Sequence, residues 1–232
     1  PTPQPWLDHQ GDTSAPQLAR LQFDATTTQR LMARARLENT SLHGLLCAAQ
    51  LLAVSQLQPD LVEQVLTLAS PVDMRAHLAP VPNALPVGLF VAIVSSTHRL
   101  ALGSDPWALA REIRAHMQTQ LGRGEAHLFY EMYGLHRSAP SAAQSELLKK
   151  KLRASLPHTM VSNVGAVAST SGDPLLRNLS FALFPMPYQS LFTAASSFEG
   201  QLTLNIGYNA ARLGQHAAPL VEALRVNLLQ AV

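Results

Sequence analysis

The most apolar stretch of the chain runs from residue 42 to residue 54, LHGLLCAAQLLAV, and is apolar on almost every side. Such a segment predicts a helix buried in a core rather than one lying on a surface. Its 13 residues are fewer than the roughly 20 that a helix needs to cross a bilayer. We therefore expect a core helix that begins after a capping Thr40 or Ser41 and ends near Leu57.

Shorter patterns on either side predict further helices and strands. Runs rich in β-branched residues between turn residues indicate strands, whereas apolar residues that recur every three or four positions indicate helices. The predicted strands are 19–23, 67–75, 86–100, 158–164, 175–184, 190–198 and 201–209. The predicted helices are 29–38, 42–57, 59–66, 106–122, 125–136, 141–154 and 217–229.

Three local signals define element boundaries. Asp105 followed by Pro106 is typical of a helix start, because the carboxylate caps the first turn and Pro suits its first position. Glu199-Gly200 is a two-residue turn compatible with a hairpin. Pro71 cannot donate a ladder hydrogen bond, so it predicts that the strand 67–75 leads into a turn.

The order of these elements indicates the fold class and the domain organisation. Helices and strands are interleaved without a strict βαβ repeat, which predicts an α/β or α+β fold with a mixed sheet. Residues 1–18 are rich in Pro and lack the regions of a signal peptide, so they are expected to form an extended arm or linker. No composition break divides residues 19–232, which are expected to form one structural unit.

Composition excludes several classes of protein. Charged residues make up only 14% and hydrophobic residues 47%, which is incompatible with disorder. The net charge is 17 − 15 = +2, so nucleic acid is a poor expected partner. Cys47 is the only cysteine, which rules out a disulfide scaffold and favours a cytoplasmic location.

Most catalytic patterns are absent from the sequence. There is no G-x-S-x-G elbow and no phosphate-binding loop. Cys47 lies in the apolar helix, where a buried inert thiol is favoured over a nucleophile. His127 and Glu131 share a helical face, but two ligands do not make a metal site, so no metal is expected. All nine histidines stand alone.

The basic run KKKLR at residues 149–153 is open to two interpretations. The first is an ordinary solvated helical face. The second is a docking point for an acidic carrier protein or a phosphorylated cofactor, formed by Lys149, Lys150, Lys151 and Arg153.

Several segments, in order, resemble the C-terminal half of the condensation-domain and chloramphenicol-acetyltransferase superfamily. Within it they are most similar to the phthiocerol/phthiodiolone dimycocerosyl transferase group of alcohol acyltransferases. The segments that carry the resemblance are ENTSLHGLLCAAQLLAV (38–54), SPVDMR (70–75), NALPVGLFVAIV (83–94), VSNVG (161–165) and FEGQLTLNIGYNAARL (198–213).

This resemblance implies a mixed-sheet, two-layer α/β sandwich that is one half of a two-part enzyme. It also implies transfer of an acyl group from a CoA or carrier-protein thioester to an alcohol or amine, with no bound cofactor. The family's general base is the second His of an HHxxxD motif in the N-terminal half, and this chain contains no HHxxxD. Because the chain also begins at Pro1 without Met, we expect a fragment or a separate gene product that needs an N-terminal half and is inactive alone.

The resemblance also assigns site residues. Arg75 matches the arginine that pairs with the Asp of the motif and supports its loop, the alternative being a surface arginine. Ser162, Asn163 and Gly165 match a strand that lines the substrate tunnel and orients substrate or stabilises an oxyanion, the alternative being ordinary strand hydrogen bonding. The residues that shape an acyl pocket, or else only the core, are Phe181, Phe184 and 186–188.

Two functions from different classes therefore remain. One is the C-terminal half of an acyltransferase, whose partners are the N-terminal half or a second chain and an acyl carrier protein. The other is a non-catalytic module of the same fold that binds carrier proteins as a scaffold. An independent enzyme of another class has no supporting motif.

Overall fold

The computed structural model describes residues 15–81, 88–101, 103–132, 146, 159–167, 176–185 and 189–232. Its strands are β1 (Pro16–Phe23), β2 (Glu63–Asp73), β3 (Val91–Ala101), β4 (Thr159–Val167), β5 (Leu191–Phe198) and β6 (Gln201–Asn209). Its helices are α1 (Ala25–Leu37), α2 (Leu42–Ser55), α3 (Pro106–Gly122), α4 (Leu128–Met132), α6 (Ala210–Leu213) and α7 (Ala217–Leu229). Short 3₁₀ turns are η2 (Arg75–His77), η3 (Glu125–His127) and η4 (Gly214–His216).

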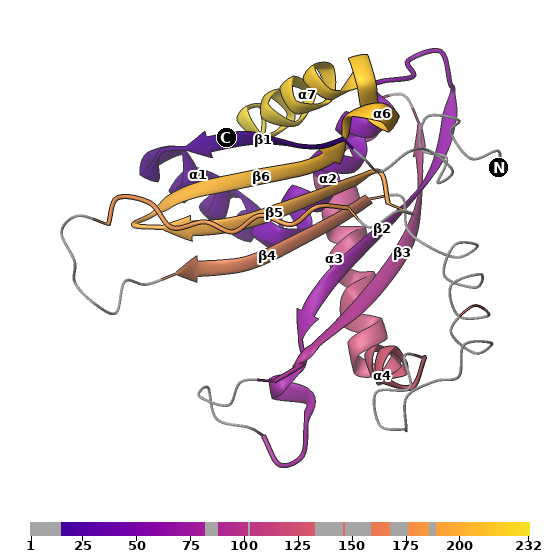
Figure 1. Cartoon of the computed structure of the whole chain (residues 1–232), viewed down its shortest axis with the longest axis vertical. Coiled ribbons are helices and arrows are strands. Elements are labelled where there is room, and N and C mark those ends of the chain that lie inside the picture. Colours follow the sequence, from indigo (N-terminus) through magenta and orange to yellow (C-terminus); the bar gives the residue numbers. More distant parts are fainter. Residues whose placement is uncertain are drawn as a thin grey trace.

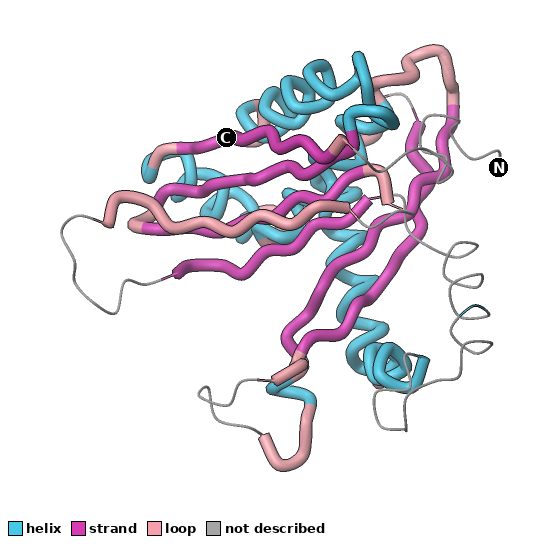
Figure 2. The backbone as a smooth tube through the Cα atoms, viewed as in Figure 1, coloured by secondary structure: helices cyan, strands magenta, loops and turns pink. Residues whose placement is uncertain are grey.

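The strands form a six-stranded sheet in the order β1-β6-β5-β4-β2-β3. β4 runs parallel to both β2 and β5, and the other neighbours are antiparallel. Figures 1 and 2 show the helices α1, α2, α3 and α7 on one face of this sheet. This arrangement confirms the mixed-sheet, two-layer α/β fold.

The helices begin where capping residues predict them. Asp24 accepts a hydrogen bond from the Thr27 amide (2.7 Å) at the start of α1. Ser41, rather than Thr40, caps α2, and Asp105 accepts from the first turn of α3. These bonds satisfy amide groups that have no partner inside the helix.

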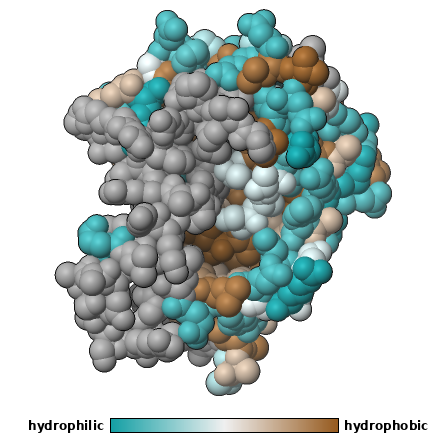
Figure 3. Space-filling model, turned by 90° about the vertical axis from the view of Figure 1, so that its right-hand side faces the viewer, coloured by the Kyte–Doolittle hydropathy of each residue, from teal (hydrophilic) through white to brown (hydrophobic). Residues whose placement is uncertain are grey.

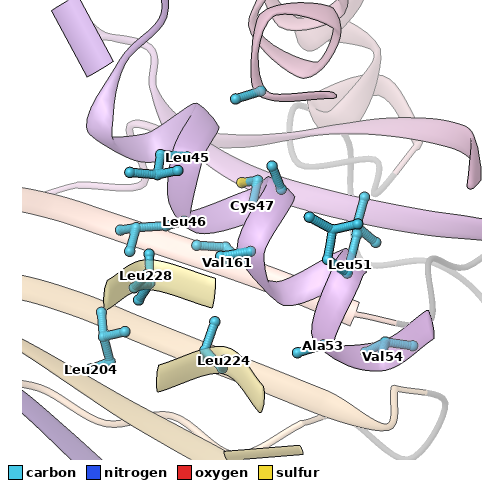
Figure 4. Packing of buried hydrophobic residues seen from close by; sticks show 14 of the residues in the cluster. Leu45, Leu46, Cys47, Leu51, Ala53, Val54, Val161, Leu204, Leu224 and Leu228 are labelled. Atoms are coloured by element: carbon cyan, nitrogen blue, oxygen red, sulfur yellow. The ribbon is translucent and has the colours of Figure 1, made fainter. Parts of the chain in front are cut away.

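The core lies between the helices and the sheet. Residues 44–54 of α2 are all buried, as the apolar pattern predicts. In α7 the buried stripe contains Leu220, Leu224 and Leu228. Figure 4 shows α2 packed between Val161 of β4 and the leucines of α7. Each fully buried leucine stabilises the fold by about 2 kcal/mol. No helix in the described part of the chain is long and apolar enough to cross a membrane.

The predicted helix 59–66 is wrong, because residues 63–66 belong to β2. All eleven residues of β2 pair with β3, from Glu63↔Ala101 to Asp73↔Val91, and this long-range pairing overrides the local helical pattern. The predicted strand 67–75 does lead into a turn, η2, but only after β2 has passed Pro71 and ended at Asp73. Pro71 lies inside β2, and among the described residues β4 pairs only with Leu68 and Ala69, so no ladder on that edge requires an N–H at position 71.

Other boundaries differ by a few residues. β1 begins at Pro16, so residues 16–18 of the predicted arm belong to the sheet, and residues 1–14 lie outside the described residues. β3 starts at Val91 instead of residue 86. Of the predicted helix 125–136, the structure describes η3 and α4, and the predicted helix 141–154 lies almost entirely outside the described residues.

The predicted strand 175–184 is wrong, because residues 176–185 have no regular secondary structure. We call this segment the strap, since it crosses the sheet face opposite the helices. The Asn205 side chain of β6 holds it there, donating through Nδ2 to the Phe181 carbonyl (2.7 Å) and the Ser180 hydroxyl (3.1 Å). These side-chain bonds replace the backbone ladder that a strand would need.

Replacing Gly207 by Ala is expected to displace the strap, because a Cβ at this position would lie 2.2 Å from the Leu183 carbonyl oxygen. We expect a loss of about 2 kcal/mol in the free energy of unfolding, measured by urea denaturation. The matched control is Gly122→Ala, where an added Cβ meets no atom within 4 Å. Equal stabilities of the two variants would contradict this close packing.

Candidate functional site

In the described part of the chain, the parallel strands β2 and β4 pair only at Leu68↔Thr159 and Ala69↔Met160. Beyond these pairs β2 continues beside β3, and β4 continues beside β5, so the strands separate (Figure 1). Gln50 of α2 donates to the Met160 carbonyl (3.3 Å) at this point. We call residues 70–73 of β2 and 161–165 of β4 the fork. The carboxyl ends of separating parallel strands are the usual place for ligands in such sheets.

The β4 side of the fork contains three residues that the sequence analysis singled out. Ser162 is buried, and the Asn163 side chain accepts a hydrogen bond from the Gly165 amide (2.9 Å). The pairing of β4 with β5 shifts register between Asn163 and Ala166, which marks a bulge. Gly165 has φ +75°, a conformation that favours glycine. The bulge thus turns the strand just beyond Ser162.

Two residues beyond the β2 side of the fork, the turn η2 begins at Arg75. Its Nη1 donates to both carboxylate oxygens of Asp73 (3.2 Å each), and its backbone N–H donates to Asp73 Oδ1 (3.0 Å). The guanidinium also lies 4.5 Å from the ring centre of Phe90. Arg75 is therefore held in place inside this chain by Asp73 and Phe90, whereas its pairing with an Asp of another half stays a prediction.

The first two turns of α2 bring His43 and Cys47 to Ser70 of β2. His43 Nε2 lies 2.9 Å from Ser70 Oγ and 3.4 Å from Cys47 Sγ. Burial lowers the pKa of His43 to about 4, so its ring is neutral at pH 7. Burial also raises the pKa of the Cys47 thiol to about 12, against a smaller lowering by the hydrogen bond to Ser70. This thiol is buried and inert, in agreement with the expectation from the sequence.

Sequence reasoning missed this cluster. His43 stands alone in the sequence, and Ser70 lies 27 residues away from it. One signal was available: His43, Cys47 and Gln50 recur at helical spacing in an otherwise apolar helix, so polar atoms share one of its faces.

The other predicted site residues are dispersed. Phe181 packs against the apolar cluster of Met160 and Phe192 on the strap side of the sheet, and the Phe184 side chain is half-exposed. Outside the described residues lie Lys149, Lys150, Lys151, Arg153 and 186–188. Where the structure is described, no three His, Cys, Asp or Glu side chains gather as a metal site.

The surface carries a recess on one side of the molecule. Figure 3, which looks from the right-hand side of Figure 1, shows an apolar floor and a polar rim beside the residues drawn in grey. An apolar floor with polar surroundings is typical of small-molecule sites.

Residues 12–207 match the family described as phthiocerol/phthiodiolone dimycocerosyl transferase C-terminus. No curated protein matches the chain significantly in sequence. Among solved structures, the chain is similar to polyketide synthase associated protein 5 from Mycobacterium tuberculosis (TM-score 0.62, 19% identity), covering 94% of this chain and 52% of that one.

Two other solved structures share the fold. A trichothecene 15-O-acetyltransferase from Fusarium sporotrichioides has a TM-score of 0.72 at 13% identity, over 94% of this chain and 47% of its own. The condensation domain for chain release from the enacyloxin polyketide synthase has a TM-score of 0.66 at 17% identity, over 95% of this chain and 42% of its own. The chain therefore spans about half the length of the structures that it matches.

Proposed function

Since this chain belongs to the phthiocerol/phthiodiolone dimycocerosyl transferase C-terminal family, we propose that it is the C-terminal half of an acyltransferase. The acyl group comes from a thioester of CoA or of a phosphopantetheinyl carrier protein, and an alcohol or amine accepts it. CoA and the carrier are co-substrates in this proposal, not bound cofactors.

The observation that carries the proposal is the fork. Attack on a thioester carbonyl places negative charge on its oxygen, and polar donors fixed near that oxygen stabilise the transition state. Ser162 supplies such a hydroxyl on β4, whereas Asn163, the next residue of the strand, lies on the other face and accepts from the Gly165 amide, and the glycine at the bulge leaves room for close approach at position 165. Arg75, at the end of the β2 side, supports the loop that carries the base.

The general base belongs to the missing half in this proposal. The sequence has no HHxxxD, and the two enclosed histidines among the described residues already have partners. His43 bonds Ser70, and His98 bonds Glu112 (2.8 Å) and Ser96 (2.7 Å). A ring held in this way is not positioned to take a proton from an acceptor hydroxyl.

Reassembly of the enzyme tests the function. The chain is mixed with an N-terminal half that carries HHxxxD, and acyl transfer from an acyl-CoA to a long-chain alcohol is measured. We expect no transfer with this chain alone and transfer with the assembled pair. In the matched control, the second His of the motif is replaced by Ala, and acyl transfer by the assembled pair should be lost.

Two outcomes would contradict the proposal. Acyl transfer by this chain alone would mean that the general base lies in this chain and not in an N-terminal half. An assembled but inactive pair that still binds acyl carrier protein would favour the scaffold module, and its binding is expected to weaken with salt if residues 149–153 form the docking point.

A further inference from the structure

Three polar side chains form a hydrogen-bonded chain between β3 and α3. His98 Nδ1 lies 2.8 Å from Glu112 Oε1, and His98 Nε2 lies 2.7 Å from Ser96 Oγ. Ser96 and His98 are two residues apart on β3, so their side chains share the strand face toward α3, the helix that carries Glu112 (Figure 1). Both distances are those of well-formed hydrogen bonds.

The two partners of His98 determine which of its nitrogens carries the proton. An ionised carboxylate only accepts hydrogen bonds, so Nδ1 carries the proton and donates to Glu112. Nε2 then has a free lone pair, and the Ser96 hydroxyl donates to it. Burial lowers the pKa of His98, against a smaller raising by Glu112, so the ring is neutral at pH 7.

This is the arrangement that activates a serine as a nucleophile. One group takes the hydroxyl proton, and a carboxylate orients that group and stabilises its charged form. Such a set is recognised by geometry and not by the order or spacing of its residues in the sequence. The contact that keeps a substrate alcohol from His98 makes Ser96 the hydroxyl that His98 can deprotonate. Ser96 is half-buried, so part of the residue is accessible to solvent.

We infer that Ser96 and His98 are catalytic residues for the hydrolysis of small activated acyl esters by this chain alone, with Glu112 as a positioning residue. Ser96 Oγ bonds the acyl carbon, its proton passes to His98 Nε2, and the bond from that carbon to the leaving group breaks. The leaving group takes the proton from Nε2. Water then attacks the acyl carbon and gives a proton to Nε2, and Ser96 regains this proton as the carboxylic acid leaves. The inference is independent of the proposed function.

Hydrolysis of p-nitrophenyl acetate by the purified chain tests this inference. We expect a burst of p-nitrophenol and an acetyl group on Ser96, located by peptide mass spectrometry. An alkyl fluorophosphonate should label the same oxygen with loss of fluoride. Ser96→Ala should reduce hydrolysis to the rate in buffer. Ser95→Ala is the matched control and should keep the wild-type rate, because that side chain lies on the other face of β3.

The pH profile separates catalysis from a structural role. Among the described residues, the titratable groups that face His98 are Glu112 and His116, whose ring centre lies 5.5 Å from that of His98. The rate should fall as the pH drops through the pKa of His98, below 6.5, because only the neutral ring accepts a proton. Glu112→Gln removes a group that raises this pKa, so the midpoint should move to lower pH. His98→Gln should lower the rate at least ~100-fold.

Several results would overturn the inference. They are a folded chain that hydrolyses the ester no faster than buffer, a label on a residue other than Ser96, and a wild-type rate in Ser96→Ala. Unfolding midpoints are measured on the same preparations. If a variant fails to fold, the position of the label and the pH profile of the wild-type chain decide. The proposed function is tested separately, by transfer to an alcohol in the assembled pair.

Discussion

Acidification from pH 7 to pH 4 should lower the free energy of unfolding of this chain by up to about 3 kcal/mol through His43 alone. The folded pKa of about 4 lies below the ordinary value of 6.5. Between these values the unfolded chain binds a proton that the folded chain excludes, so stability is complete above pH 6.5 and is lost as the pH falls toward 4. Urea denaturation at a series of pH values measures this loss.

The variant His43→Gln isolates the contribution of this ring. Gln can still bond Ser70 but does not titrate, so the decline of stability with acid should become shallower by the same amount. His77→Gln, at an exposed position, is the control and should keep the wild-type slope. The decline of stability with acid that remains in His43→Gln includes the contribution of His98, whose pKa is also lowered by burial. Parallel pH profiles of His43→Gln and wild type would refute the assignment.

Replacing Arg75 by Ala in the assembled enzyme should lower kcat/KM for acyl transfer at least ~100-fold. The expected cause is an uncompensated carboxylate at the loop that carries the base. The fold of this chain should survive, because the Arg75–Asp73 pair is partly exposed and such pairs contribute about 1 kcal/mol or less. Steady-state kinetics and an unfolding midpoint measured on the same preparation separate the two effects.

Arg99→Ala is the matched control, since Arg99 lies on the same ladder and forms an exposed ion pair with Glu63. It should leave transfer unchanged. Arg75→Lys should restore only part of the activity, because an ammonium group cannot offer two parallel donors. If Arg75→Ala retained full activity, Arg75 would be an ordinary surface arginine of the strand end.

Much of the fold was predictable because its signals are local. The hairpin at Glu199-Gly200 is confirmed, and both turn residues have positive φ, 47° and 78°. The last helix has the predicted bounds, 217–229. In each case capping, turn chemistry or apolar spacing decides the structure within a few residues.

The predictions that were wrong concern segments whose secondary structure depends on residues far away in the sequence. Residues 61–66 show a pattern compatible with a helix, but residues 63–66 form a strand because they pair with β3, 32 to 38 residues later. Residues 175–184 look like a strand, yet the Asn205 side chain fixes the strap by bonds that no local pattern contains. The site follows the same rule: the resemblance located Ser162 and Arg75, whereas the contacts of His43 with Ser70 and Cys47 depend on tertiary packing.

The narrow junction between β2 and β4 has a mechanical consequence. In the described part of the sheet, two residue pairs join the β2–β3 ladder to the four strands β1, β6, β5 and β4, and the Thr159–Thr67 hydrogen bond lies beside them. The spacing of the two sides of the fork is therefore set by α2, which bonds Ser70 of β2 through His43 and the Met160 carbonyl of β4 through Gln50.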